Sequence, residues 1–223
     1  VRYIRDKGAM NCIISSETTD VEALKKQLAK VPNMHGLELS SKVTCKAAYT
    51  LGNEKAAYRV AVMDYGAKNN ILRSLQERDC YLKVFPMKST LKEILEFNPD
   101  GIMLTNGPGD PAAMAKESEE VKAMVNSGKP VFGICLGHQL LAQSQGISTY
   151  KMHAGHRGIN HPVINLISGK SEVTSQNHGY AIDAESLPND WRISFKHLHD
   201  HSVAGICHTS LPYSAVQFHP EAA

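Results

Sequence analysis

Almost continuously apolar runs alternate with amphipathic stretches over the middle of the chain. Strands are predicted where the apolar runs occur, at 59–64, 80–86, 101–106 and 131–135. Helices are predicted where apolar side chains recur at helical spacing, at 67–78, 90–97, 114–127 and 137–146. In the second of these helices we expect Leu91, Ile94 and Leu95 to face the core. Apolar strands that alternate with helices are typical of a parallel sheet covered on both faces.

The pattern changes after Gly146. Strand-like runs with little helical periodicity follow, separated by Gly, Pro, Asn and Asp, at 149–153, 161–167, 172–177, 192–198 and 214–219. Short strands bounded by turn residues favour antiparallel pairing. The predicted fold class is therefore α/β, with a mostly parallel sheet flanked by helices and an added antiparallel layer.

Residues 1–56 differ from both of these regions. Two pieces have helical character, at 3–10 and 21–31, and a polar stretch without clear periodicity continues to Lys55. This segment has too little apolar material for an independent core. We therefore predict two units, with 1–56 as a docked appendage or the edge of something larger, and 57–223 as the main domain.

Composition and charge narrow the class of protein. Hydrophobic residues make up 42% of the 223 residues, which is ordinary for a protein with a packed core. No apolar run approaches the roughly 20 residues of a membrane-spanning helix, and the N-terminus has no leader pattern. A formal charge of +2 with scattered basic residues argues against nucleic acid as a partner. Five cysteines without a CxxC pair argue against a disulfide framework or a thiolate zinc site. From the cysteines, the apolar runs and the N-terminus together, we expect a cytoplasmic protein without a membrane partner.

One cysteine differs from the other four. Cys135 lies between a predicted strand and a predicted helix, and Gly133-x-Cys135-x-Gly137 has the form of a nucleophile elbow. Such a turn strains the backbone and requires neighbours without Cβ atoms. The helix would direct its N-terminal amides at Cys135 and favour the reactive thiolate, and the N–H of Leu136 could donate to an oxyanion. A buried structural cysteine is the alternative, but open α/β sheets place their sites at the carboxyl ends of strands.

A second glycine-rich turn, 105–111, follows the preceding strand and should end beside Cys135. Gly107 and Gly109 would let the backbone approach a ligand, and N–H groups here could complete an oxyanion hole. Phosphate binding is the competing interpretation, but neither GxxxxGK[ST] nor a helix-opening GxGxxG is present, and Asp110 would repel a phosphate. Taken alone, the loop could also be an ordinary β-turn.

A general base has to come from among eleven histidines. His219 follows a predicted strand at 213–218, and Glu221 lies two residues further on, across Pro220. Glu221 can therefore orient His219 while the imidazole accepts the proton of the thiol. By itself, a His-x-Glu sequence is weak evidence.

Two groups of histidines invite a metal interpretation. His153, His156 and His161 fall in a predicted loop, and the segment 197–201 carries a histidine at every second position. Neither HExxH nor paired cysteines accompany them. We therefore expect no metal site and interpret these histidines as polar surface or hydrogen-bonded loop positions.

Together, GICLGHQ (133–139), the GPGDP loop (107–111) and the final HPE (219–221) resemble the class I, or triad, glutamine amidotransferases. Finer features resemble the small, glutamine-hydrolysing subunit of carbamoyl-phosphate synthetases. These are MDYGAKNNILR (63–73), LTNGPGDPA (104–112), HAGHRGINHPV (153–163) and TSQNHGYAID (174–183). The resemblance covers essentially the whole chain, and it identifies 1–56 as a remnant of that subunit's N-terminal domain with its linker.

The resemblance implies a role for each matching residue. The catalytic residues would be Cys135 as nucleophile, His219 as base and then acid, and Glu221 as the group that orients His219. The N–H groups that hold the oxyanion would be those of Leu136, Gly107 and Gly109. The residues that bind the amino-acid end of glutamine would be Gln139, Asn177, Gly179 and Tyr180.

The implied reaction hydrolyses the side-chain amide of L-glutamine to glutamate and ammonia through a thioester on Cys135. The ammonia would pass through a tunnel to a carbamoyl-phosphate synthetase large subunit, for arginine and pyrimidine biosynthesis. No cofactor is expected in this chain, and ATP and Mg²⁺ are expected only on the large subunit. Family members have more of the N-terminal domain and a closing helix after the triad, so we expect this chain to be a fragment that lacks its last helix.

Two other functions stay open. A free-standing γ-glutamyl hydrolase would use the same residues on peptides without a partner. A non-catalytic docking or regulatory subunit would keep the fold without the reaction, and the intact set of Cys135, His219 and Glu221 argues against it.

Overall fold

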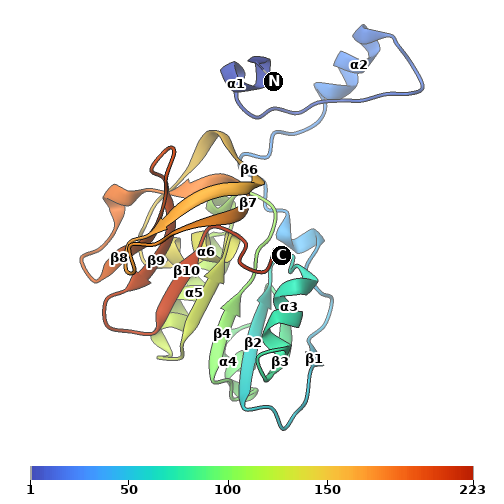
Figure 1. Cartoon of the computed structure of the whole chain (residues 1–223). Helices are drawn as coiled ribbons and strands as arrows, with labels where there is room; N and C mark the ends of the chain where they lie inside the picture. The colour runs from blue at the N-terminus through green and yellow to red at the C-terminus, as the bar shows by residue number, and fades with distance from the viewer. Residues whose placement is uncertain (1, 223) are drawn as a thin grey trace.

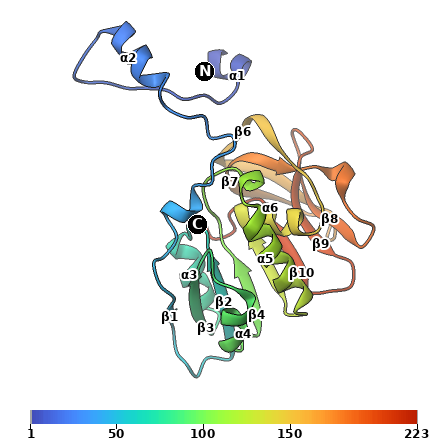
Figure 2. The same cartoon turned by 180° about the vertical axis from the view of Figure 1, so that it is seen from behind.

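The computed structural model describes residues 2–222, which form one ten-stranded sheet with helices packed against it (Figures 1 and 2). The strands follow the order β1-β3-β2-β4-β5-β10-β9-β8-β6-β7 across the sheet. The first strands along the chain are β1 (Tyr49–Leu51), β2 (Tyr58–Asp64), β3 (Cys80–Pro86), β4 (Gly101–Leu104) and β5 (Val131–Ile134). The later strands are β6 (Thr149–Asn165), β7 (Ser171–Ile182), β8 (Trp191–His197), β9 (Val203–His208) and β10 (Tyr213–Val216).

The central strands β3, β2, β4, β5 and β10 run parallel to one another. Successive side chains of a strand point to opposite faces, so Met63 packs into one core and its neighbour Val62 into the other. The four strands predicted between residues 59 and 135 are confirmed to within two residues at each end. Because these strands are parallel, the segments that follow them meet at one edge of the sheet.

Helices cover both faces of the parallel strands. They are α3 (Asn69–Gln76), α4 (Leu91–Glu96), α5 (Ala115–Asn126) and α6 (Leu136–Ser144). One core includes Ile94 from α4 together with buried residues of α5 and α6, whereas Ile71 from α3 packs into the core on the opposite face. All four predicted helices are confirmed, but the inward placement of Leu95 is wrong, since this side chain is 39% exposed.

The strands after α6 extend the same sheet. β9 pairs antiparallel with β10, and β8, β6 and β7 follow in turn, so hydrogen bonds at β10 join the antiparallel region to the parallel one. The predicted fold class is confirmed. β9 is not among the predicted strands, and β6 is one strand where two runs are predicted. The register of β6 against β7 shifts between Lys151 and His156, and again between Gly158 and His161. These shifts interrupt the alternation of side chains between the two faces of β6.

Residues 2–48 precede the first strand. α1 (Arg2–Lys7) and α2 (Val21–Leu28) contain no buried residue and extend beyond the main body of the molecule in both views, where Arg5 of α1 contacts His153 of β6 (Figures 1 and 2). The N–H of Asp110 donates to the carbonyl of Leu37 at 2.9 Å and fastens this segment to the loop after β4. β1 pairs antiparallel with β3, although no strand is predicted there. The division at residue 56 stays a prediction.

Short 3-10 helices complete the described structure, at Ser40–Lys42, Pro111–Ala113 and Ala184–Ser186. Within residues 2–222, no helix combines the length and the apolar character that crossing a membrane requires.

Candidate active site

Cys135 lies at the turn between β5 and α6 and has a left-handed backbone conformation, with φ of 55° and ψ of −103°. Residues other than glycine seldom adopt such a conformation, so the predicted strained turn is confirmed. A Cβ atom on Gly137 would collide with the carbonyl oxygen of Leu104, and one on Gly133 would lie 2.6 Å from the carbonyl oxygen of Gly137. The turn therefore needs glycine at 137 to pack against β4 and glycine at 133 to pack against the start of α6.

This turn borders a cavity of about 390 Å³ at the carboxyl edge of the parallel strands. The predicted site residues that line it are Gly107, Gly109, Cys135, Gln139, Asn177, Gly179, Tyr180 and His219. Leu136 and Glu221 lie behind the lining and are almost completely buried. The fold thus brings together all ten predicted site residues, in a space large enough for a small-molecule ligand.

The loop after β4 packs directly against the cysteine turn. The N–H of Gly137 donates to the carbonyl of Thr105 at 3.0 Å. Gly107 approaches the carbonyl of Tyr65 so closely that a Cβ atom there would clash, and Gly109 has φ of +113°. Both glycines therefore allow the backbone to reach the cavity, as the sequence predicts.

His219 and Glu221 form a buried pair in the segment after β10. His219 Nδ1 donates to Glu221 Oε1 at 2.8 Å, which leaves Nε2 for a second partner. Burial alone would lower the pKa of His219, but hydrogen bonds and charges from Cys135 and Glu221 raise it to about 9. Burial likewise opposes ionisation of Glu221, yet the hydrogen bond from His219 and the charges of His219 and Lys68 lower its pKa. The three predicted catalytic residues are therefore coupled to one another.

Two other buried histidines near this turn have a lowered pKa, whereas that of His219 is raised. Desolvation lowers the pKa of His138 to about 4 and that of His178 to about 3. Both are therefore neutral at pH 7, whereas His219 can carry a proton beside Cys135.

Two residues that contact Glu221 are absent from the predicted site. Lys68 Nζ lies 3.3 Å from Glu221 Oε1, and the side-chain amide of Asn70 donates to the backbone carbonyl of Glu221. Both residues follow β2 at the carboxyl edge of the sheet, and this position is the signal that could have identified them.

Gln139 is held in place by hydrogen bonds from its own amide group. Its Nε2 donates to the carbonyl of Tyr180 and to Oε1 of Gln217, each at 3.0 Å. Both amide hydrogens are then used, so Oε1 is the atom left for a ligand. Asn177 and Gly179 come from β7, and the carbonyl of Asn177 lies 3.9 Å from Cys135 Sγ.

The rest of the lining includes residues that the sequence does not predict. They are Met34, Lys68, Asn106, Pro108, Arg157 and Ser175. Met34 comes from the N-terminal segment, and Arg157 adds a cation from β6. Tyr180 adds a neutral phenol, because burial and the nearby carboxylate of Asp110 raise its pKa to about 12. The cavity is therefore polar, with a cation available for an anionic group.

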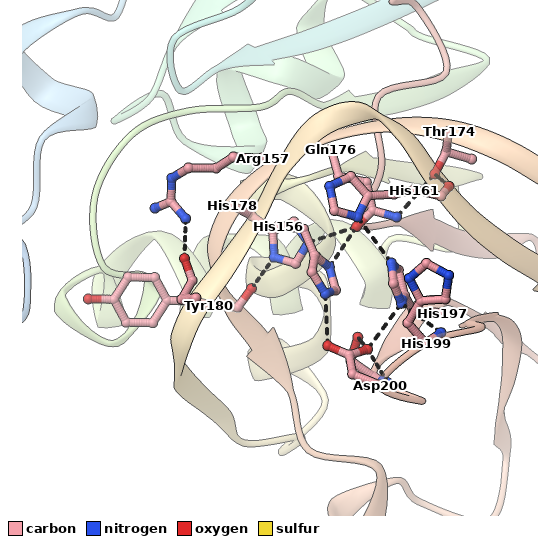
Figure 3. Close-up of polar contacts among 12 residues, drawn as sticks. His156, Arg157, His161, Thr174, Gln176, His178, Tyr180, His197, His199 and Asp200 are labelled. Atoms are coloured by element: carbon pink, nitrogen blue, oxygen red, sulfur yellow. Dashed lines mark hydrogen bonds and ion pairs between the residues drawn. The ribbon is translucent and has the colours of Figure 1, made fainter. Parts of the chain in front are cut away.

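Several histidines lie where the sequence does not place them. His153, His156 and His161 are in β6, so their assignment to a loop is wrong, and His156 and His197 are buried, so they are not surface positions. One ring nitrogen from each of His156, His161 and His197 lies within 4.8 Å of the others, and we name these three residues the histidine cluster (Figure 3). Pairing of β6 with β8 brings them together, which spacing along the chain cannot reveal.

Known proteins resemble this chain over its whole length. The family model "Glutamine amidotransferase class-I" matches residues 61–223. The carbamoyl phosphate synthase small chain of Chlorobaculum tepidum is 50% identical and that of Clostridium acetobutylicum 44% identical, each over 100% of this chain. In both cases the chain spans 62% of the length of the curated relative.

Solved structures share the fold. A putative GMP synthase protein from Thermoplasma acidophilum is 25% identical, with a TM-score of 0.66 over 76% of this chain and 87% of that one. A glutamine amidotransferase from Thermotoga maritima is 19% identical and has a TM-score of 0.59 over 74% of this chain and 76% of that one. Since the family model covers the strands from β3 to β10, the cysteine turn and the His219 segment together, the chain belongs to the class-I glutamine amidotransferase family.

Proposed function

We propose that this chain hydrolyses the side-chain amide of L-glutamine and supplies the ammonia to the large subunit of a carbamoyl-phosphate synthetase. The observation that carries the proposal is the coupling of Cys135, His219 and Glu221 at the border of the cavity. A cysteine with an oriented histidine is the arrangement that nucleophilic catalysis on a carbonyl carbon requires. The names of the relatives, carbamoyl phosphate synthase small chains, support the choice of partner.

In the first half of the reaction, Cys135 Sγ attacks the side-chain carbonyl carbon of glutamine. A C–S bond forms, and the carbonyl oxygen becomes negatively charged near the N–H groups of Leu136 and of the loop 107–109. Leu136 opens α6, so its N–H has no partner within the helix. His219 then gives its proton to the leaving nitrogen, the C–N bond breaks, and ammonia leaves behind a γ-glutamyl thioester.

In the second half, neutral His219 accepts a proton from water while the water oxygen attacks the thioester carbon. The C–S bond breaks, glutamate leaves, and a protonated His219 again faces the Cys135 thiolate. Glu221 accepts from Nδ1 throughout, so it fixes the ring and stabilises the imidazolium each time it forms.

The amino-acid end of glutamine carries an ammonium and a carboxylate group. Gln139 Oε1 suits the ammonium because it is an acceptor held in a fixed position. Arg157, which lines the same cavity, suits the carboxylate because its guanidinium is always charged. Asn177, Gly179 and Tyr180 bind the same end of the substrate.

The remaining assignments belong to the same proposal. The chain acts in the cytoplasm and holds no cofactor, and the large subunit holds ATP and Mg²⁺. The ammonia is consumed there in the synthesis of carbamoyl phosphate, which serves arginine and pyrimidine biosynthesis.

Mass spectrometry of the intact chain after exposure to 6-diazo-5-oxo-norleucine, a glutamine-like electrophile, tests the proposal. We expect one adduct at Cys135, protection by L-glutamine, and no adduct in Cys135→Ala. Cys12 is an internal control, because it is exposed and would react with an unselective electrophile. An ammonia-release assay on the same samples should show hydrolysis in the wild-type chain and none in Cys135→Ala.

Labelling of Cys12 at the same rate as Cys135, or labelling that glutamine does not slow, would contradict a glutamine site. Hydrolysis that survives in Cys135→Ala would exclude the thioester route. Adding a purified carbamoyl-phosphate synthetase large subunit should couple glutamine hydrolysis to carbamoyl phosphate formation, and failure of a labelled, active chain to do so would contradict the choice of partner.

A further inference from the structure

The histidine cluster is not used by the proposed reaction. It lies where β6 meets β8, and Asp200 in the turn after β8 contacts two of its rings (Figure 3). His156 Nε2 lies 2.8 Å from Asp200 Oδ2, and His197 Nδ1 lies 3.2 Å from Asp200 Oδ1. Both rings therefore use one nitrogen toward the same carboxylate and direct the other nitrogen away from it.

Nitrogens of the three rings converge. The rings of His156 and His197 are stacked, with centroids 4.1 Å apart and planes 17° apart, and one nitrogen from each of His156, His161 and His197 lies within 4.8 Å of the others. His161 Nδ1 is 3.1 Å from His197 Nε2. Three imidazole nitrogens from different positions of the chain thus surround one small space.

We propose that His156, His161 and His197 bind a divalent transition-metal ion, for which Zn²⁺ is the best fit. Zinc binds histidine nitrogens at about 2.0–2.1 Å, so two ligands of a tetrahedral ion lie roughly 3.4 Å apart. The 3.1 Å between His161 Nδ1 and His197 Nε2 is close to that separation. In the metal-free chain a single proton occupies the space between them, and the metal replaces it.

The surroundings match what a histidine-bound metal needs. A ligating histidine usually donates its other N–H to a carboxylate or a carbonyl, and Asp200 is placed to accept from His156 Nε2 in this way. His197 Nδ1 lies 3.2 Å from the same carboxylate and 3.2 Å from the backbone nitrogen of His199. The ligands must also be neutral. An imidazole is a neutral ligand, and two of the three, His156 and His197, are almost completely buried, so a bound ion would be shielded from bulk water.

Two polar side chains of β7 contact His156. His178 Nε2 lies 3.1 Å from His156 Nδ1, and its other nitrogen is 2.7 Å from the carbonyl of Tyr180. Gln176 Oε1 is 2.9 Å from His156 Nδ1. A metal bound by the three histidines, with water completing its tetrahedron, would cross-link β6 to β8, so we assign it a structural role and no part in bond cleavage.

Titration of the chelator-stripped chain with Zn²⁺, read by competition with a chromophoric chelator, tests the site. We expect one equivalent to bind, with at least tenfold weaker binding in His161→Gln and in His197→Gln. His199→Gln is the matched control, because His199 is an exposed histidine two residues from His197 and lies outside the histidine cluster. Co²⁺ should give the intense visible absorption of a four-coordinate site in wild type and in the control.

Asp200→Asn provides a variant that keeps every ligand. The Asp200 side chain is 44% exposed, so the fold should tolerate the change. Zinc affinity should fall by roughly 10- to 100-fold. Zinc should raise the melting temperature of wild type and His199→Gln, and should not raise that of His197→Gln. The proposal is overturned if zinc does not bind saturably, or if folded His161→Gln and Asp200→Asn bind it as tightly as the control.

Discussion

Replacing Glu221 by Gln isolates the effect of one buried charge on His219, the proposed catalytic histidine. In the wild-type chain, Glu221 Oε1 accepts from His219 Nδ1 at 2.8 Å and lies 3.3 Å from Lys68 Nζ. Glu221→Gln keeps the shape of the side chain but removes the negative charge, and its amide can present either an oxygen or an N–H to the ring. We expect the imidazolium of His219 to lose stability.

The magnitude follows from the pKa of His219, which rises from its ordinary 6.5 to about 9. Burial opposes this rise, so Cys135 and Glu221 together contribute more than the difference of about 2.5 units, or about 3 kcal/mol. Removal of the Glu221 charge takes away one of these two contributions, so it should lower the pKa of His219 by an amount on the order of one unit, or about 1 kcal/mol.

An NMR titration of the His219 imidazole measures this shift directly. Neutral His219 cannot protonate the leaving ammonia, so the high-pH limb of kcat/KM for glutamine should move to lower pH by the same amount. The maximal rate should fall by roughly 10²- to 10⁴-fold. Asp190→Asn is the matched control, because it removes a carboxylate 3.3 Å from His208, a histidine outside the cavity lining, and should change neither quantity.

An unchanged pKa of His219 in a folded Glu221→Gln chain would refute the electrostatic reasoning. A slower reaction with that unchanged pKa would mean that Glu221 acts by orienting the ring and not through its charge.

Three further predictions concern the fold around the site. Gly137→Ala should lower the free energy of unfolding by about 1–3 kcal/mol in chemical denaturation, because its Cβ atom meets the carbonyl of Leu104. Gly101→Ala, where the nearest atom lies at 3.5 Å, should cost little. Lys68→Met should raise the pKa of Glu221, measured by carboxyl NMR, yet change stability by less than about 1 kcal/mol because Lys68 is half exposed. Folding lowers the pKa of Glu221, so its ionised form stabilises the fold above the ordinary pKa of 4.5 and this contribution is lost as the pH falls through the folded-state pKa. The stability difference between wild type and Glu221→Gln, followed by denaturation at several pH values, should therefore shrink as the solution is acidified.

The sequence alone determined the parallel half of the fold and the proposed catalytic residues that lie in local motifs. The strands and helices between residues 59 and 146 could be predicted because each has its own periodicity of apolar side chains. The turn at Cys135 could be predicted because the two glycines that it needs are two residues away on either side. His219 and Glu221 are likewise neighbours in the chain, so their contact depends little on the rest of the fold.

Only the tertiary structure decided which distant segments meet. Lys68 contacts Glu221 because β2 and β10 both end at the same edge of the sheet, and the sequence places these residues far apart. The histidine cluster forms because β6 pairs with β8, whereas the sequence around His156, interrupted by glycines at 155 and 158, suggests a loop. Periodicity records which face of an element is buried. It does not record which strand pairs with which, because that choice depends on the packing free energy of the whole sheet.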